Sequence, residues 1–545
     1  MDLTHRILSM EGFNTMKTKQ NLLKDLISWS ILALISTGII VQLNRLFVPK
    51  YTYQNTPWAT TNTYNGFYKM KKNTVDVIFL GSSVAANAWC PQEIYNDYGI
   101  RSYNLASEQQ SIFLSYYWLK EALRYQNPKV VVLDLRFLLT RNSENPLNTT
   151  EGLVRKCLDP MRLSPVKLEA AIDIGNRCPD QSAMSFLLTN IRFHTRWDSG
   201  LEDLDFRKDL WSDAELKGWD TMLYQPNEET LSYQPFVREK DDDNENCSVN
   251  DLQEEYLCKI GDLCKQNKIQ LILMNLPGNT EPSKYPSVMT TGYDNFSRHI
   301  AEKIGADYYN LGEEDTYKTI YTPNSNESLV GHSNYWGSVK LSQYTGKLLQ
   351  SYSVPLVTDD QYEKTRKFYA YVAKNANMQY ITDFDQYLDA INDKNYTLFF
   401  SISDEGSKSI GEKEMEKLRL LGIRTDLRGK YRNSWYAIVD PIKGVTEELS
   451  PNLKIEHFGV FGDAEIKYYI ASAGYNTNAS MSSINIAGIE YSHQTRGINI
   501  VVWDNVGRTV IDSVTFDTCD QAQASRNWFT EMEDRGMDPT FNTRW

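Results

Sequence analysis

Three continuous apolar runs constrain the fold of this chain more than any other feature. They are VDVIFLG at 75–81, KVVVLDL at 129–135 and IQLILMNLP at 269–277. A strand that faces water on one side alternates apolar and polar residues, whereas a strand covered on both faces is apolar throughout. Segments with apolar residues three and four apart, at 111–125 and 249–267, lie between the runs and are typical of helices. The sequence therefore predicts an α/β domain with a parallel sheet covered by helices on both faces.

An apolar segment near the amino terminus indicates a membrane anchor. Residues 26–43 form a run of 18 without a formal charge, and with 46–48 the run approaches the roughly 20 residues that span a bilayer. No small-residue cleavage site follows, which favours an uncleaved anchor over a signal peptide, and a buried soluble helix is the remaining alternative. Lysines precede the run, so the positive-inside rule places 1–25 in the cytoplasm, a single transmembrane helix at 26–48 and the bulk of the chain outside the cell membrane.

Changes in pattern divide the rest of the chain. Polar and aromatic residues without a period at 49–70 predict an extended tether. The stretch at 138–251, between the second and third of the apolar runs, is long enough to form a cap over a site. Short strands rich in β-branched and aromatic residues follow and predict a mixed, mainly β module. The expected boundaries are a first domain at 71–354 with the insertion at 138–251, a linking helix at 355–379, a second domain at 380–530 and a carboxyl-terminal tail at 531–545.

The charge and cysteine content exclude several classes of protein. The formal net charge is -13, with 57 Lys and Arg against 70 Asp and Glu, and a nucleic-acid partner would require a basic surface. The seven cysteines are scattered without a CxxC pair, so no zinc site is indicated. We therefore expect no nucleic-acid partner, no metal and no cofactor.

Two adjacent serines follow the first apolar run. In TVDVIFLGSSVAANAWC (74–90), Gly81, Ser82 and Ser83 stand at the carboxyl end of the predicted strand, where parallel sheets place their sites. A tight turn from a strand into a helix can expose a hydroxyl, and the start of the helix offers backbone N–H groups to a developing oxyanion. The alternative is that either serine only caps the helix.

One histidine has a context that fits a general base. The block GHSNYWGSVKLSQYTGKLL (331–349) places His332 in H-x-N-x-x-G spacing before an amphipathic helix. The other histidines stand in no comparable pattern; they are His5, His194, His299, His457 and His493. A single histidine is more often structural than catalytic, so the spacing alone leaves both roles open.

These blocks together resemble the SGNH/GDSL hydrolase superfamily. The similarity rests on GSSV at 81–84, NLA at 104–106 and HSN at 332–334, and it covers about residues 70–352. Within the superfamily, the chain is most similar to the membrane-anchored branch typified by the DltD and AlgJ-like proteins of cell-envelope acylation. The resemblance implies a flavodoxin-like parallel sheet and a reaction that needs no metal.

The resemblance also assigns roles to residues. Ser83 aligns with the nucleophile of the G-D-S-L motif and His332 with the general base, an arrangement that transfers acyl groups through a covalent intermediate. The backbone N–H of Ser83 and one from the loop at 106–109 would line the oxyanion hole. The residues implied in oxyanion binding or in support of the site are Ser82, Asn104, Ala106, Gln109 and Asn334.

Departures from the family pattern concern the third member of the triad. An aspartate usually stands three residues before the histidine, and Leu329 occupies that position here. The nearest polar candidates for orienting His332 are Asn326 and Glu327, while Asp134, in the run at 129–135, could form an ion pair that orients a loop. Loss of a triad carboxylate can lower turnover by about four orders of magnitude, so an inactive domain is the competing expectation.

The second domain resembles the interleukin-like EMT inducer (ILEI, or PANDER) domain with its halves in reversed order, as in a circular permutation. The similarity rests on RGIN at 496–499, FDT at 516–518, DEGS at 404–407 and SW at 434–435. It implies a glycan-binding module in which exposed aromatic rings stack on sugars. The candidates are Tyr475, Trp503 and Trp435, and the alternative is that these rings pack the core of the module.

The sequence thus predicts a membrane-anchored envelope protein that transfers or hydrolyses acyl groups on a cell-surface polysaccharide through Ser83 and His332. An adjacent multispanning membrane acyltransferase would be the acyl donor, as in the systems that the chain resembles. The competing hypothesis is a non-catalytic surface protein whose degenerate SGNH domain serves as a scaffold that holds glycan.

Overall fold

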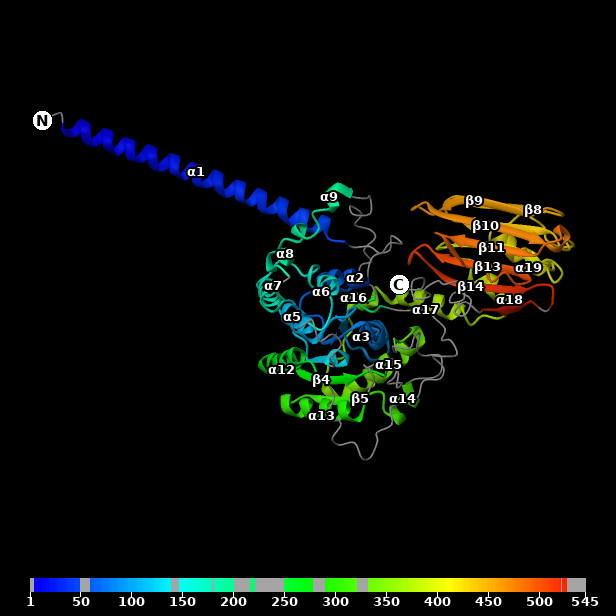
Figure 1. Cartoon of the computed structure of the whole chain (residues 1–545), viewed down its shortest axis with the longest axis horizontal. Helices are drawn as coiled ribbons and strands as arrows, with labels where there is room; N and C mark the ends of the chain where they lie inside the picture. Colours follow the sequence, from blue (N-terminus) through cyan, green and yellow to red (C-terminus); the bar gives the residue numbers. More distant parts are fainter. Residues whose placement is uncertain are drawn as a thin grey trace. The chain divides into compact units, whose positions relative to one another are not determined.

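The computed structural model describes residues 4–49, 59–138, 147–178, 181–199, 216–220, 249–277, 290–320, 332–520 and 522–526 (Figure 1). Their contacts form two compact units. The first unit joins Met1–Tyr51 to Met161–Leu210, and the second joins Thr52–Pro160 to Trp211–Trp545. The acidic run at 239–246 and the predicted tail at 531–545 lie outside the described residues.

The first unit is built on one long helix. α1 (Thr4–Phe47) contains the segment Leu22–Asn44, which is long and apolar enough to cross a membrane and has no buried residue in its most apolar 18-residue stretch. Both membrane anchors and signal sequences contain such a helix near the amino terminus. The helix begins at Thr4, so the boundary expected near residue 26 is a change of composition within one helix.

Part of the predicted insertion belongs to this first unit. α7 (Pro165–Arg177), α8 (Ala183–Leu187), the 3-10 helix η2 (Thr189–Ile191) and α9 (Arg196–Ser199) follow one another, and η2 contacts α1. α7 starts at a proline after Ser164, whose hydroxyl oxygen accepts the Lys167 backbone N–H at 3.1 Å. The cap expected over a site stays a prediction, because much of the insertion lies outside the described residues.

The second unit contains the predicted parallel sheet. Its strand order is β2-β1-β3-β4-β5, and each neighbouring pair is parallel. The strands are β1 (Val77–Leu80), β2 (Ser102–Asn104), β3 (Val130–Asp134), β4 (Gln270–Asn275) and β5 (Asp307–Asn310). The chain passes from β1 to β2 on one side and returns to β3 on the other, so a binding crevice is expected at the carboxyl end of β1.

Helices surround this sheet (Figure 1), as the apolar runs predict. On one face, Phe79, Val132 and Ile272 belong to a core that includes residues of α3 (Ser83–Ala88), α4 (Pro91–Tyr98) and α15 (Tyr335–Leu349). The adjacent strand residues Ile78 and Val131 point to the opposite face and are fully buried as well. The other helices of this domain include α5 (Ile112–Ala122), α6 (Glu151–Leu158), α12 (Asp251–Gln266), α13 (Thr291–Ile304) and α14 (Glu314–Ile320).

A short helix replaces part of the predicted tether. α2 (Ala59–Phe67) buries Tyr64 and Phe67 completely. The Tyr64 ring stacks on Trp118 of α5 with 4.1 Å between the ring centres. The expectation of an extended chain throughout 49–70 is therefore wrong, because the aromatic residues of this segment pack against the domain that follows.

The carboxyl-terminal domain is mixed and mainly β, as predicted. Its sheet has ten strands, of which seven run in the order β12-β11-β10-β6-β13-β14-β15, while β7 joins β6 to β8 and β9 pairs with β10. The strands are β6 (Tyr396–Asp404), β7 (Ser434–Asp440), β8 (Gly444–Ser450), β9 (Ile455–Phe461), β10 (Ile466–Gly474), β11 (Met481–Ile486), β12 (Ile489–Glu490), β13 (Gly497–Asp504), β14 (Thr509–Asp517) and β15 (Gln523–Ser525). The helices are α17 (Arg366–Met378), α18 (Phe384–Ala390) and α19 (Glu412–Leu420).

Alternate residues of β6 enter two different cores of this domain. Phe400 packs in a cluster with residues of α17, α18 and α19, whereas Phe399 packs in a cluster with residues of β9, β10 and β11. Trp435 lies in the first cluster and is 0% exposed, and Trp503 lies in the second and is 8% exposed. Of the two alternatives for these tryptophans, core packing is the one observed, since the inward faces of β7 and β13 carry them.

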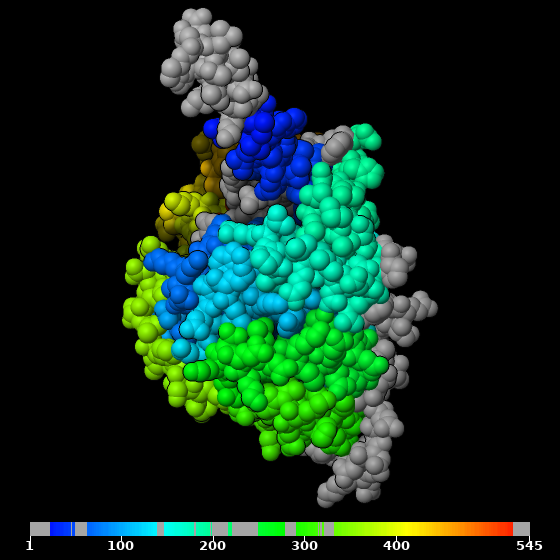
Figure 2. Space-filling model, turned by 90° about the vertical axis from the view of Figure 1, so that its left-hand side faces the viewer, coloured from blue at the N-terminus to red at the C-terminus, as the bar shows by residue number. Residues whose placement is uncertain are grey.

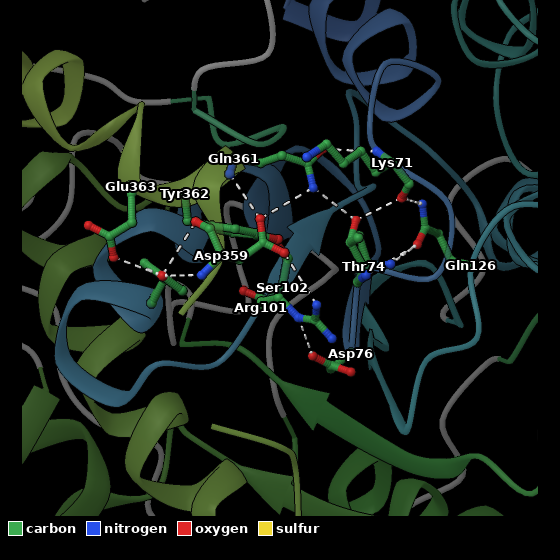
Figure 3. Close-up of polar contacts among 12 residues, drawn as sticks. Lys71, Thr74, Asp76, Arg101, Ser102, Gln126, Asp359, Gln361, Tyr362 and Glu363 are labelled. Carbon is green, nitrogen blue, oxygen red and sulfur yellow. Dashed lines mark hydrogen bonds and ion pairs between the residues drawn. The ribbon is translucent and has the colours of Figure 1, made fainter. Parts of the chain in front are cut away.

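Polar contacts hold the segment that joins the two domains against the amino ends of the parallel strands β1 and β2 (Figure 3). Arg101, just before β2, pairs with Asp76 at 2.7 Å and with Asp359 at 3.2 Å. The hydroxyl of the buried Tyr362 donates to the carbonyl of Ser102 at 2.7 Å. In place of the single linking helix expected at 355–379, the chain forms α16 (Asp360–Glu363) and then α17.

Candidate active site

The turn between β1 and α3 brings Ser83 to the carboxyl edge of the sheet. Gly81 has φ +146°, and a Cβ atom there would lie 2.7 Å from the Asp134 Cβ and 2.8 Å from the Ala85 Cβ. Only glycine fits this position, because both the backbone conformation and the space exclude a side chain. Ser82 is extended, and Ser83 is the first residue of α3.

His332 meets Ser83 across 249 positions of the sequence. Its Nε2 lies 2.8 Å from the Ser83 Oγ, and both side chains are half-buried. The serine hydroxyl donates to Nε2 when the other ring nitrogen carries the proton. The expected meeting of the two side chains above the sheet is thus observed.

Asn334 fixes the start of the helix that follows the histidine. Its side chain is fully buried, and its Oδ1 accepts the Gly337 N–H at 3.0 Å as the cap of α15. Asn334 thus sets where α15 begins, three residues after His332, and its support of the site stays a prediction.

Asp134 lies beneath the serine pair. Its carboxylate accepts from the Ser82 hydroxyl and from the Arg136 backbone N–H, each at 3.3 Å. Burial raises the pKa of the Asp134 carboxyl, and the positive charge of Arg136 opposes the shift. Asp134 thus contacts Ser82 and the backbone of Arg136, whereas the sequence suggested an ion pair that orients a loop.

Asn104 has a structural role that the sequence did not indicate. Its amide nitrogen lies within hydrogen-bond distance of the carbonyls of Ala85 and Trp89, both at 2.9 Å, and its Oδ1 accepts the Ala106 N–H at 3.2 Å. The contacts tie the end of α3 to the loop after β2. The Asn104 amide and the Ala106 N–H thus have partners inside the fold, and their oxyanion or support roles stay predictions.

The loop after β2 is held by contacts on several sides. The Ser107 N–H donates to the Gly81 carbonyl at 3.2 Å. Gln109 has φ +50°, and its side-chain oxygen accepts the Thr149 hydroxyl at 3.2 Å. The loop therefore lies directly beside the turn that carries Ser83. The support role assigned to Gln109 stays a prediction.

Tyr64 is the residue of this region that sequence reasoning missed. Its hydroxyl lies 2.5 Å from the Ser107 Oγ and donates to the Gln110 side chain at 2.6 Å, within a fully buried network. The helical spacing of Tyr64, Phe67 and Tyr68 was an available signal for this packed segment.

The remaining sequence candidates divide into two groups. Asn326, Glu327 and Leu329 lie outside the described residues, so the identity of a third catalytic residue stays a prediction. Tyr475 is 53% exposed and remains the one aromatic candidate of the three that a ligand could reach. Among the described residues, no three His, Cys, Asp or Glu side chains gather as metal ligands would.

Comparison with known proteins gives a distant structural similarity. No family model matches the chain, and no curated protein matches it. Among solved structures, the chain is similar to a GDSL-like lipase from Bacteroides thetaiotaomicron, with 9% sequence identity and a TM-score of 0.26. The similarity covers 53% of this chain and 98% of the lipase.

Proposed function

We propose that this protein transfers acyl groups to or from a cell-envelope polysaccharide through Ser83 and His332, as a member of the DltD/AlgJ-like branch of the SGNH superfamily. The observation that carries the proposal is the 2.8 Å contact between Ser83 Oγ and His332 Nε2 at the carboxyl end of β1. A serine hydroxyl alone is a weak nucleophile, and a histidine at this distance can accept its proton as it attacks.

The reaction has two balanced steps. Ser83 Oγ attacks the acyl carbonyl carbon while its proton moves to His332 Nε2, and the leaving group of the donor then takes that proton. A sugar hydroxyl or water next gives its proton to His332 and attacks the acyl-serine, which releases Ser83 Oγ to recover the proton. A sugar acceptor makes the protein a transferase, and water makes it an esterase.

The same proposal places the protein in the cell membrane. α1 is the single-pass anchor, with the amino terminus inside and both domains outside. A multispanning membrane acyltransferase beside it would supply the acyl donor. The proposal treats the exposed apolar surface of Leu22–Asn44 as the lipid-facing side of the anchor.

The carboxyl-terminal domain is proposed to bind the glycan as a permuted ILEI-like module. Tyr475 and Tyr431 are both exposed, and the Arg432 guanidinium lies 4.7 Å and 5.0 Å from the two ring centres. Aromatic faces stack on the apolar faces of sugar rings, so this cluster replaces Trp435 and Trp503 as the candidate surface. Unchanged polysaccharide binding in Tyr475→Ala would remove the support for this assignment.

Labelling with a fluorophosphonate tests the serine. The full-length chain in detergent should react covalently, and Ser83→Ala should lose labelling, while Ser351→Ala, an exposed serine after α15, should label like the wild type. Absence of labelling in the wild type would favour the non-catalytic scaffold. Acyl-glycan product measured with and without sugar acceptor then separates transfer from hydrolysis.

A further inference from the structure

The amino-terminal helix and the insertion are joined by hydrogen bonds at one place. Asn44, the last residue of the apolar segment of α1, donates from its side chain to the Leu187 carbonyl at 3.3 Å. Its Oδ1 accepts the Asn190 N–H at 3.2 Å, and its carbonyl accepts the Thr189 hydroxyl at 3.0 Å. The end of α8 and the whole of η2 therefore lie level with the end of the apolar segment.

A further contact extends this junction into α9. Arg196 donates from its guanidinium to the Phe47 carbonyl at 2.9 Å, at the last residue of α1. Figure 2 shows the described part of α1, in dark blue, directly beside the atoms of the insertion, in teal. The insertion is thus bonded to the anchor over the last four residues of its helix.

Apolar side chains are exposed on both sides of the junction. Ile191 is 47% exposed and directly follows Asn190, while Met184 is 52% exposed and precedes Leu187 by three residues. Three helical residues advance about 4.5 Å, so Met184 cannot lie far from the depth of Asn44. The headgroup layer on each side of a bilayer is about 5–8 Å thick, which is comparable to this spacing.

The neighbouring helix α7 adds exposed apolar residues. Leu168 and Ile172 are four residues apart and so share one face of α7, and both are exposed, as is Leu163 just before the helix. α7 packs on α8 within the same unit. Two basic residues follow Ile191 within three positions, and both are exposed: Arg192 and His194. Long basic side chains beside apolar ones suit a boundary between lipid and water.

We propose that the segment from α8 to the start of α9 lies in the headgroup region of the bilayer that α1 spans, with Met184 and Ile191 in contact with lipid. This inference rests on the membrane anchoring proposed above. The occupant of the exposed apolar surface is the membrane itself, because hydrogen bonds hold the segment at the end of the membrane-spanning helix. Part of the insertion then acts as a membrane-surface element, which would restrain the orientation of the anchor unit.

Depth measurement in reconstituted bilayers tests this placement. Full-length chains in phosphatidylcholine vesicles carry one NBD label, at Met184→Cys or Ile191→Cys, in a background where Cys247, Cys258 and Cys519 are serine. Both labels should shift to shorter emission wavelength. Both should also be quenched at least twofold more by lipids brominated near the headgroup end of the acyl chain than by lipids brominated near its tip.

Two control positions separate this inference from the anchoring itself. Ile35→Cys, within the apolar segment, should be quenched from the middle of the bilayer, and Leu420→Cys, an exposed apolar residue of α19, should not be quenched. Quenching at Ile35 with no quenching at 184 and 191 would overturn the inference and leave the anchor standing. No quenching at Ile35 would overturn the anchor and with it the inference. A wavelength shift at 184 and 191 without quenching would mean that the labels are buried against protein. This outcome would also overturn the inference.

Discussion

At Asp134, burial and a neighbouring positive charge shift the pKa of the carboxyl in opposite directions. The carboxyl group is buried between the Ser82 hydroxyl and the Arg136 N–H, and burial raises its pKa above the usual value near 3.8. A raised carboxyl pKa means that the folded state holds its proton more tightly than the unfolded chain, so folding loses stability as pH rises through the folded pKa.

We expect Asp134→Asn to be more stable than the wild type at pH 7. The amide oxygen can still accept the Ser82 hydroxyl, and no charge remains to be desolvated. The difference in unfolding free energy, measured by urea denaturation, should shrink as the pH falls, because the wild-type carboxyl then takes up a proton. Asp262→Asn, at an exposed position on α12, should show no such pH-dependent difference. An equal difference at pH 7 and pH 4 would contradict this account.

At the same scale, the sequence predicted the proximity of Ser83 and His332, which lie 2.8 Å apart, better than the contacts of the residues around them. The G-S-S and H-S-N blocks each left a structural role open, and only the resemblance of the blocks taken together paired the two side chains. Nothing in the sequence shows that the Asn104 amide turns inward to the carbonyls of α3, so its hydrogen bonds could not be predicted. The sequence left open whether Trp435 and Trp503 are exposed or buried, because the face of a strand that is covered depends on distant elements.

Among the elements, α2 holds the loop at 106–110 beside the candidate active site. Tyr64→Phe keeps the ring that stacks on Trp118 and removes the hydroxyl that bonds Ser107 and Gln110. Losing this buried hydrogen-bond partner should cost about 1–3 kcal/mol of unfolding free energy. The fluorophosphonate reaction of Ser83 should also slow severalfold, because the loop at 106–110 lies beside the Gly81 turn.

Tyr68→Phe is the matched control for this prediction. Tyr68 follows α2 directly, and its hydroxyl donates to Glu121 at 3.1 Å, away from the loop at 106–110. We expect a smaller loss of stability and an unchanged rate of labelling. Equal labelling rates in Tyr64→Phe and wild type would show that α2 does not position the loop.

The elements also differ in how far the sequence could predict them. β1, β3 and β4 were found because burial on both faces makes every position apolar. α2 was missed because its nine residues are mostly polar, and only contacts from Tyr64 and Phe67 to the rest of the domain hold it in place. The single long helix expected at 355–379 is broken between α16 and α17, where the polar contacts of Asp359 and Tyr362 fix its start.

At the scale of the second unit, the two domains share a hydrophobic core. Cys90 and Tyr335 of the first domain belong to the same buried cluster as Tyr369 and Val372 of α17. The Tyr369 hydroxyl also donates to Glu93 of α4, a buried carboxyl whose pKa is raised by burial. Because one cluster contains residues from both domains, unfolding of either one exposes apolar surface of the other.

We therefore expect the two domains to unfold together. Tyr369→Ala should remove about 3–5 kcal/mol, through the cavity that it leaves and the hydrogen bond lost by Glu93 Oε2, while Glu93 Oε1 still accepts from Gln343. Calorimetry should show one transition for the second unit, at a temperature lower by roughly 5 °C than in the wild type. The temperature at which heating abolishes Ser83 labelling, which reports on the first domain, should fall by the same amount. Phe458→Ala, at an exposed position on β9, should move neither. Two separate transitions would contradict this expectation if Tyr369→Ala moved only one of them and Ser83 labelling was lost only at the other. The domains would then be energetically independent despite the shared cluster.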